Sequence, residues 1–224
     1  MRERPILFSS PMVRAILDGS KTQTRRAVKG FALELLAPDG FTPEYVAIPE
    51  NGNSPYGYAG DRLLVKETFF AWGRWETRFS AKKGRDEWHF IDMTLECGKQ
   101  YRYVVNMIGE NAPRGRGGVT PQWWKRPAIF MPRAASRINL DNDDVRVERL
   151  QDISEEDAVA EGVETIQYTG ENAGPNRYSI NMGDCWLNSP TAAGAYRMLW
   201  ESINGPGSWD ANPWVWVVKF RRLP

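Results

Sequence analysis

Short apolar runs rich in β-branched and aromatic side chains recur along the chain, separated by polar segments that contain Gly, Pro and Asn. Such runs predict β-strands, because these side chains pack well on a pleated surface. The predicted strands are Pro5–Phe8, Arg62–Phe70, Trp88–Ile91, Tyr101–Met107 and Trp214–Arg221. The last strand is apolar on both faces at its centre, which is typical of a strand covered by a helix.

A β-hairpin is predicted across residues 137–150. In the run Val145–Leu150, Val145 and Val147 alternate with polar residues and share one face. Arg137–Leu140 supplies the other arm, and the intervening Asn-Asp pair has the chemistry of a hairpin turn. The hairpin would add two neighbouring antiparallel strands to the sheet.

Two short helices are predicted from their end signals. The first begins at Ser10, which precedes a proline, and ends before Gly19. The second begins at Ser154, followed by three acidic residues, and ends at Gly162. Glu161 lies at the end of this second helix.

A longer helix is predicted over Thr191–Asn204, where the helical spacing is clearest. Ser189 is expected to cap it, with Pro190 at its first position. Gly205 ends it. Its predicted buried stripe consists of Tyr196, Leu199, Trp200 and Ile203.

Strands outnumber helices, and each helix lies at a connection. The chain lacks the repeated βαβ alternation of a Rossmann sheet, so the predicted fold is α+β, mainly β, a small β-barrel with flanking helices and long insertions. We expect a single domain over residues 1–224, with insertions at about 29–58 and 71–130 and a loop at about 163–190. Phe31–Leu36 is the one dense apolar piece in the first insertion. In the second, the Gly- and Arg-rich segment Ile108–Gly118 is expected to be a mobile loop.

Charge and cysteine content exclude several classes of protein. With 29 Lys and Arg against 28 Asp and Glu, the chain has a net charge of +1, so any surface for nucleic acid must be local. Cys97, Cys185 and the lone His89 cannot supply an ordinary zinc site, and no metal or cofactor is predicted. No signal peptide or membrane-length apolar run is visible, so we expect a cytoplasmic protein with free thiols and no membrane partner.

One basic group surrounds two tryptophans in the second insertion. Trp123 and Trp124 would stack on bases if exposed, but tryptophans beside a strand more often pack in a core. The basic residues around them are Arg114, Arg116, Lys125, Arg126 and Arg133.

The segment Lys21–Arg26, directly after the first helix, is polar throughout. An extended conformation would place Lys21 and Gln23 on one face and Thr22 and Thr24 on the other. A solvated, cationic strand edge explains this composition, because charged edges discourage pairing with other chains. A segment that lines a functional site explains it equally well.

Residues 16–26 read Ile-Leu-x-Gly-x-Lys-Thr-x-Thr-x-Arg, followed by Gly-Asp-x-Leu-x-Val at 60–65 and by Val147–Glu155. This order resembles the ASCH domain family, a branch of the PUA-like β-barrel superfamily associated with RNA. The runs Met131–Ile138 and Val145–Ile153 also resemble longer members of this family from tailed phages and prophages. The resemblance covers about half of the chain and implies a PUA-like barrel.

Compact bacterial ASCH enzymes hydrolyse N4-acetylcytidine with a Lys, a Thr and a Glu. The resemblance places these at Lys21, Thr24 and Glu161, with Asp157 as the alternative to Glu161. It therefore implies an amidohydrolase that removes an acyl group from an N-acylated cytidine or a related modified nucleoside. Six further polar residues, in or beside the quoted motifs, are candidates for substrate binding: Ser9, Arg26, Lys66, Glu67, Arg133 and Ser136.

These residue types suit amide hydrolysis. The Thr24 hydroxyl would attack the acyl carbon while a neighbouring group takes its proton, and a carboxyl would then activate water or protonate the leaving amine. The ordinary pKa of a lysine is about 10.4, so the pKa of Lys21 would have to fall by about 3 for it to act as a base at neutral pH. Arg25 and Arg26 would lower that pKa, whereas Glu161 would raise it. If Lys21 and Glu161 are in contact, we expect Lys21 to stay charged and stabilise the oxyanion, leaving Glu161 as the base.

Two other functions fit the same residues. A ribonuclease would hold phosphate with Lys21, Arg26 and Arg133, although the single His89 excludes the usual pair of catalytic histidines. A non-catalytic RNA-binding module would use the same cleft and bind with a steep salt dependence and no turnover. The expected partner is therefore a modified nucleoside or RNA, and the sequence leaves the oligomeric state open.

Overall fold

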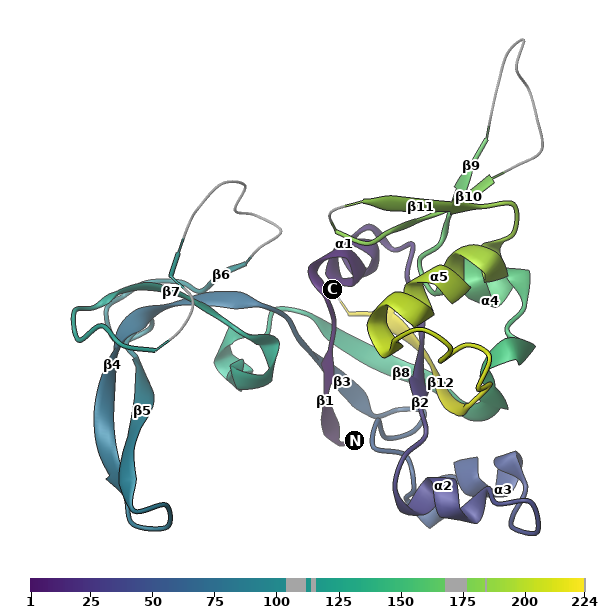
Figure 1. The fold of residues 1–224 in the computed structure, drawn as a ribbon, viewed down its shortest axis with the longest axis horizontal. Helices are drawn as coiled ribbons and strands as arrows, with labels where there is room; N and C mark the ends of the chain where they lie inside the picture. Colours follow the sequence, from purple (N-terminus) through teal and green to yellow (C-terminus); the bar gives the residue numbers. More distant parts are fainter. Residues whose placement is uncertain (104–111, 114–115, 168–176, 184, 224) are drawn as a thin grey trace. The chain divides into compact units, whose positions relative to one another are not determined.

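The structure, a computed structural model, describes residues 1–103, 112–113, 116–167, 177–183 and 185–223 (Figure 1). Residue contacts divide the chain into two compact units. The first unit consists of Met1–Ile6, Pro11–Val65 and Ile138–Pro224, and the second of Leu7–Ser10 and Lys66–Arg137. The insertion predicted at about 71–130 falls within the second unit. The single domain expected over residues 1–224 stays a prediction.

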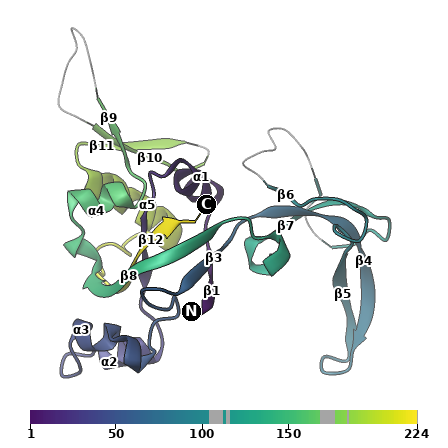
Figure 2. The same ribbon diagram turned by 180° about the vertical axis from the view of Figure 1, so that it is seen from behind.

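The first unit is built on a five-stranded sheet with the order β1-β3-β8-β12-β2 (Figures 1 and 2). Strand β12 pairs antiparallel with β8 and β2, and β3 pairs antiparallel with β8. Within the described ranges, no pairing of β1 with β2 closes this sheet, so the fold is α+β and mainly β, but the predicted barrel is not confirmed. The strands are β1 (Glu3–Leu7), β2 (Gln23–Ala27), β3 (Arg62–Lys66), β8 (Asn139–Arg149) and β12 (Trp214–Arg222).

Strand β12 is buried on both faces, as its sequence predicts. Val215 and Val217 belong to the same core cluster as Leu199 and Trp200 of helix α5 (Ala192–Asn204). Burying a large apolar side chain of this kind contributes about 1.5–3 kcal/mol. Helix α5 therefore packs against one face of the sheet.

The predicted short helices are confirmed as α1 (Ser10–Asp18) and α4 (Glu155–Ala160). The Ser154 hydroxyl caps α4 by accepting the Asp157 N–H at 3.0 Å. Two further helices, α2 (Phe31–Leu35) and α3 (Pro43–Ala47), lie side by side in the first insertion (Figures 1 and 2). The dense apolar piece at Phe31–Leu36 contains α2, although the sequence does not specify its type, and no element is predicted at α3. The 3₁₀ helices are η1 (Pro49–Asn51), η3 (Ala128–Phe130), η4 (Arg133–Ala135) and η5 (Leu150–Asp152).

The hairpin predicted across residues 137–150 is wrong, because this segment is one continuous strand, β8. Asn142 does not turn the chain; its N–H donates to the Asp61 carbonyl at 2.9 Å. The aspartates on either side of it form ion pairs with Arg221 of β12. Cross-strand partners thus outweigh the turn preference of the Asn-Asp pair.

The strand predicted at Arg62–Phe70 is in fact two strands, β3 and β4 (Phe69–Ser80). At the break, the Glu67 N–H donates to the Met131 sulfur at 3.3 Å. A buried side-chain contact therefore replaces strand pairing at this point.

The cap predicted for helix α5 is also wrong. Thr191, not Ser189, is the cap, since its hydroxyl accepts the Gly194 N–H at 3.1 Å. Pro190 consequently lies before the helix. Ile203 of the predicted buried stripe is 55% exposed, whereas the other three members are buried.

The polar connection predicted at Glu164–Pro190 contains a three-stranded sheet in the order β11-β10-β9. Its strands are β9 (Glu164–Ile166), β10 (Arg177–Asn181) and β11 (Trp186–Ser189). Ile180 of β10 joins the core cluster beside α5. Sequence pattern misses this sheet because its strands are short and carry few buried apolar residues. Residues 168–176 and 184 lie outside the described residues.

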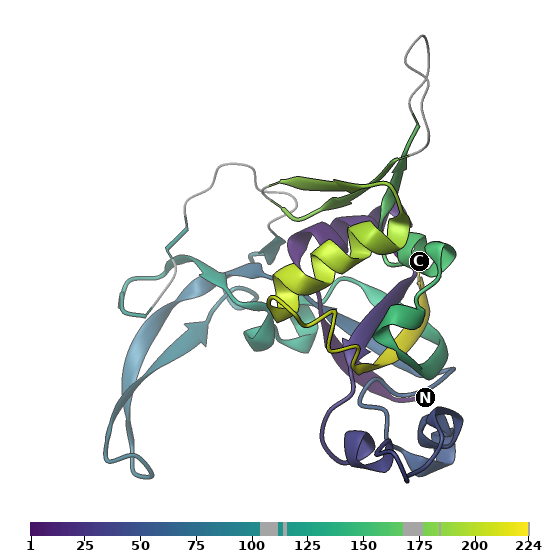
Figure 3. The same cartoon turned by 45° about the vertical axis from the view of Figure 1, so that its right-hand side comes forward.

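In the second unit, β4 pairs antiparallel with β5 (Arg85–Asp92), β6 (Arg102–Tyr103) and β7 (Gln122–Arg126) (Figure 3). Strand β5 confirms the prediction at 88–91, and β6 confirms the start of the strand predicted at 101–107. The rest of that strand, and most of the predicted mobile loop 108–118, lie outside the described residues.

The tryptophans of this unit divide between core and surface. Trp75 and Trp124 are buried, and the Trp124 indole N–H donates to the Gly73 carbonyl at 3.0 Å. The close approach of β4 to β5 requires Gly73, because a Cβ there would lie 2.1 Å from the Ile91 carbonyl oxygen of β5. Trp123 is half-buried and lies edge-to-face with Trp72 at 5.7 Å. The core interpretation is thus confirmed for Trp124.

Candidate functional site

Lys21, from the motif at residues 16–26, and Glu161, at the end of helix α4, are in contact inside the first unit. After α1 the chain turns at Gly19, and the Lys21 N–H donates to the Ala15 carbonyl at 2.9 Å. Helix α4 ends at its C-cap, Glu161, which forms a β-bridge with Lys21. Gly162 then turns the chain with φ of 98°, and a Cβ there would come within 3.5 Å of the Lys21 Cβ. These turns bring together residues that are 140 positions apart in the sequence.

The side chains of Lys21 and Glu161 form a buried ion pair. The Lys21 ammonium donates to Glu161 Oε2 at 2.7 Å and to the Glu161 backbone carbonyl at 2.7 Å. The side chains are 0% and 2% exposed. A pair this deeply buried loses its hydration, so each partner depends on the other for stability.

Arg25 extends the pair into a charged network. Its guanidinium lies 3.6 Å from Glu161 Oε1 and donates to Asp157 at 2.5 Å and to Glu148 at 3.1 Å. Arg146 contacts the same two carboxylates, Asp157 and Glu148, from the outer side. The network alternates cations and anions, and this alternation lets a buried cluster of charges persist.

Burial lowers the pKa of the Lys21 ammonium, because removing it from water disfavours its charged form; the Glu161 carboxylate partly restores the pKa. Arg26 and Arg25 lower it further, as the sequence predicts. Burial and the Glu161 charge together raise the pKa of Tyr196 well above its usual value, so the phenol keeps its proton. Burial alone would raise the pKa of Asp157, but the hydrogen bond from Arg25 lowers it.

The lowered pKa of Lys21 predicts that stability rises with pH in alkaline solution. Between this lowered value and 10.5, the unfolded lysine keeps a proton that the folded one has lost, so the free energy of unfolding increases with pH. The increase is up to about 1.4 kcal/mol per pH unit. Urea unfolding of the wild type and Lys21→Met, from neutral pH to 10.5, measures it. The wild type should gain stability relative to the variant, and a constant difference would contradict the prediction.

A cavity of about 60 Å³ lies between β2 and α5, next to this network. Strand β2 is the last strand of its sheet, so consecutive residues along its free edge line the cavity. Of the predicted site residues, Thr24, Arg26 and Glu161 line it. The other lining residues are Met12, Arg25, Ala27, Tyr196, Leu199, Trp200, Ile203 and Asn204.

Several polar atoms beside this cavity are buried without a hydrogen-bond partner among the described residues. They are Glu161 Oε1 and the Nε and Nη1 atoms of Arg25. Glu161 Oε1 and Arg25 Nη1 lie 3.6 Å apart as an ion pair without a hydrogen bond, so each keeps hydrogen-bonding capacity for a polar ligand or a reacting group.

The remaining substrate-binding candidates belong to the second unit and are not among the residues that line this cavity: Ser9, Lys66, Glu67, Arg133 and Ser136. Glu67 is buried, and Arg137 donates to both of its carboxylate oxygens, at 2.8 and 3.2 Å. Arg137 also lies over the Tyr103 ring at 4.0 Å. These contacts give Glu67 a structural role within the second unit.

Sequence reasoning does not assign Arg25 or Tyr196 to the site. A signal for Arg25 exists, since it shares its face of the extended segment with Lys21 and Gln23. All three are buried, so this segment is not a solvated strand edge. Tyr196 gives no such signal, because a helix stripe predicts burial without specifying what it faces.

The described residues contain no group of three His, Cys, Asp or Glu side chains suited to a metal ion, and Cys97 and Cys185 are free and exposed. No helix among them is long and apolar enough to span a membrane.

Comparisons of the chain with protein-family models, with curated proteins and with solved structures found no match.

Proposed function

We propose that this protein is an amidohydrolase of the ASCH type, with a PUA-like core, that removes an acyl group from an N-acylated cytidine or a related modified nucleoside. The contact between Lys21 and Glu161 carries the proposal. Two residues that the resemblance assigns to catalysis form a buried pair, and the third, Thr24, lines the cavity beside it. A stability role alone does not require a cavity beside polar atoms that lack hydrogen bonds.

In the proposed reaction, the Thr24 hydroxyl oxygen attacks the acyl carbonyl carbon while Glu161 Oε1 takes the hydroxyl proton. The C–N bond then breaks, and Glu161 returns the proton to the leaving amine of the cytidine. Water next attacks the acyl-threonine ester while Glu161 takes a proton from it, the ester C–O bond breaks, and Glu161 returns the proton to the Thr24 oxygen. The products are a carboxylic acid and the free amine, so the second step restores the enzyme.

We assign Lys21 to the positioning of Glu161. Its ammonium holds Oε2 and thereby leaves Oε1 as the oxygen that accepts a proton. Lys21 is not among the residues that line the cavity, which favours this role over direct stabilisation of the oxyanion. Arg25 Nη1 and the neutral Tyr196 phenol are the donors we assign to the developing oxyanion.

The cavity suits an acyl group better than a whole nucleoside. Its volume of about 60 Å³ is small against the several hundred Å³ of pockets that enclose a drug-sized ligand. Met12 and Leu199 provide an apolar wall for the hydrocarbon part of the acyl group. The base and ribose would then lie at the mouth of the cavity.

The alternative of an RNA-binding module or ribonuclease in this cleft has less support. Lys21 is fully buried, already paired with Glu161 and absent from the lining of the cavity, so it is poorly placed to hold phosphate. Among the cations expected to hold phosphate, Arg26 is the one that lines this cavity.

Incubation of purified protein with N4-acetylcytidine, followed by absorbance, tests the proposal. We expect turnover by the wild type and a loss of about 100-fold or more in Thr24→Val, because that variant has no hydroxyl to attack. Thr22→Val is the matched control, since Thr22 is exposed two residues away, and it should retain the wild-type rate. Equal rates in the two variants, or no turnover by the wild type, would reject this function.

A further inference from the structure

The two units differ sharply in charge. Segment 66–137 contains 14 Lys and Arg against seven Asp and Glu, a net charge of +7. The rest of the chain contains 15 Lys and Arg against 21 Asp and Glu, a net charge of −6. The near-neutral total therefore conceals a strongly basic second unit. A local charge of this size attracts polyanions.

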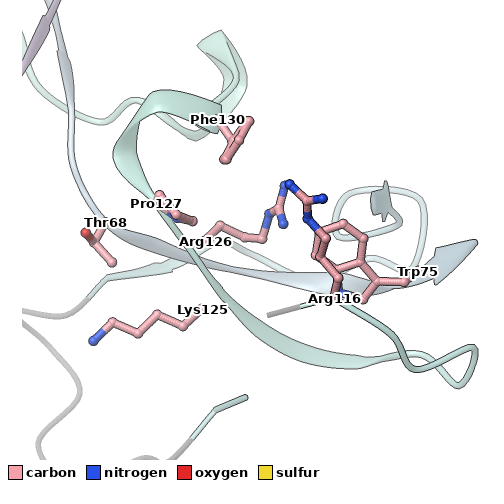
Figure 4. A pocket seen from close by; sticks show the side chains of 7 residues that line it. All are labelled: Thr68, Trp75, Arg116, Lys125, Arg126, Pro127 and Phe130. Carbon is pink, nitrogen blue, oxygen red and sulfur yellow. The ribbon is translucent and has the colours of Figure 1, made fainter. Parts of the chain in front are cut away.

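A cavity of about 400 Å³ lies wholly within this basic unit. Its volume falls within the range of pockets that hold small ligands, about 300–1,000 Å³. Figure 4 shows the guanidinium groups of Arg116 and Arg126 pointing toward each other, close to Trp75, while Lys125 points away from them. The lining residues are Thr68, Trp75, Arg116, Lys125, Arg126, Pro127 and Phe130.

Aromatic rings surround the Arg126 guanidinium. Its central carbon lies 4.8 Å from the Trp75 ring centre, 4.3 Å from that of Phe90 and 5.0 Å from that of Phe130. Among the described residues, no carboxylate lies within ion-pair distance of it. Rings cover the faces of a guanidinium and leave its N–H groups, which point outward in its plane, available to an anion.

The pocket also presents an exposed ring. Phe130 is 59% exposed, and it lines the pocket beside Arg126. A flat base can stack on such a ring, and stacking of this kind is worth about 1–3 kcal/mol per base. Two adjacent arginines with an exposed aromatic ring match a phosphate joined to a base.

We propose that this pocket binds a nucleoside phosphate, with the phosphate held by Arg116 and Arg126 and the base stacked on Phe130. Two like charges so close together repel each other, and a phosphate between them relieves this repulsion. The site is separate from the amidohydrolase cavity and does not depend on the function proposed for it.

The other face of the same sheet indicates that the nucleotide belongs to a strand of nucleic acid. There, Arg102 lies over the Trp123 ring at 4.2 Å and Lys99 over the Trp72 ring at 4.6 Å. Pairs of cations and half-exposed rings are typical of surfaces that follow a single strand. Together with the charge of the unit, they favour a polynucleotide over a free nucleotide.

Direct binding measurements test the proposal with three probes: uridine, uridine monophosphate and a fluorescently labelled octamer of uridylate. Titration calorimetry follows the first two, and fluorescence anisotropy follows the octamer. We expect the octamer to bind most tightly and uridine to show no binding. Arg116→Ala and Arg126→Gln should each weaken octamer binding by about 10-fold or more, because each removes charge-assisted hydrogen bonds to phosphate.

Arg85→Ala is the matched control, since it removes the same charge from an exposed position of β5 outside the pocket. It should leave binding within about 2-fold of the wild type. Arg116 is exposed, so its variant still tests the pocket if Arg126→Gln fails to fold. Binding of the monophosphate as tightly as the octamer, lost in the same variants, would support the pocket but identify a free nucleotide as its ligand. No binding of either phosphate probe, or equal weakening by the control, would overturn the proposal.

Discussion

Lys21→Met should lose almost all hydrolysis of N4-acetylcytidine while remaining folded. The proposed reaction needs Glu161 to take a proton from Thr24, and Lys21 holds the carboxylate by a hydrogen bond of 2.7 Å. Methionine fills similar space but donates no hydrogen bond. Removal of general base catalysis alone lowers rates by about 100- to 10,000-fold. Steady-state rates of both proteins across a pH series, with circular dichroism of each, measure the effect.

Lys29→Met is the control for this experiment, because Lys29 is an exposed lysine two residues after strand β2. It should keep the wild-type rate. If Lys21 positions Glu161, Lys21→Met should also lose the wild-type dependence of the rate on pH. A general loss of stability would leave that dependence unchanged. A folded Lys21→Met protein with most of its activity would remove Lys21 from the mechanism.

Glu161→Ala should destabilise the protein by about 3–5 kcal/mol, because it leaves the buried Lys21 charge without its carboxylate. The side chains of this pair are 0% and 2% exposed, so water does not replace the lost partner without rearrangement. The midpoint and slope of urea unfolding, followed by tryptophan fluorescence, give the free energy of unfolding.

Glu156→Ala controls for the loss of a glutamate from helix α4. Glu156 is exposed in the first turn of that helix, so its removal should change stability by less than about 1 kcal/mol. A double variant, Lys21→Met with Glu161→Gln, should be less destabilised than the sum of its two single variants, since it leaves neither charge alone. Equal effects of Glu161→Ala and Glu156→Ala would show that the pair contributes little to stability.

The two proposals assign separate tasks to the two units. The first unit contains the buried Lys21–Glu161 pair, and the second contains the basic pocket around Arg126. Each has its own variants and its own readout. Loss of acyl hydrolysis in Thr24→Val and loss of octamer binding in Arg116→Ala are therefore independent results, and either is able to fail without the other.

Much of the secondary structure follows from local signals. The mainly β composition, the β12 strand and the ends of α1 and α4 are all correctly predicted from the sequence. Each depends on residues close together in the chain: a continuous apolar run, a capping serine or a terminating glycine. Predictions fail where a partner distant in sequence decides the conformation. Asn142 has the chemistry of a turn, yet pairing with Asp61 and with β12 keeps β8 one strand, with only a shift of register opposite Lys219 and Phe220.

The sequence by itself determined that the fold is α+β and mainly β, because this follows from residue type and spacing, and its resemblance to the ASCH family named Lys21, Thr24 and Glu161 as a set. Only the tertiary structure decided that Lys21 and Glu161 are in contact, that Arg25 and Tyr196 join them, and that two arginines meet within a separate basic unit. These contacts join residues from different elements. They depend on strand register and helix packing, which no local pattern specifies.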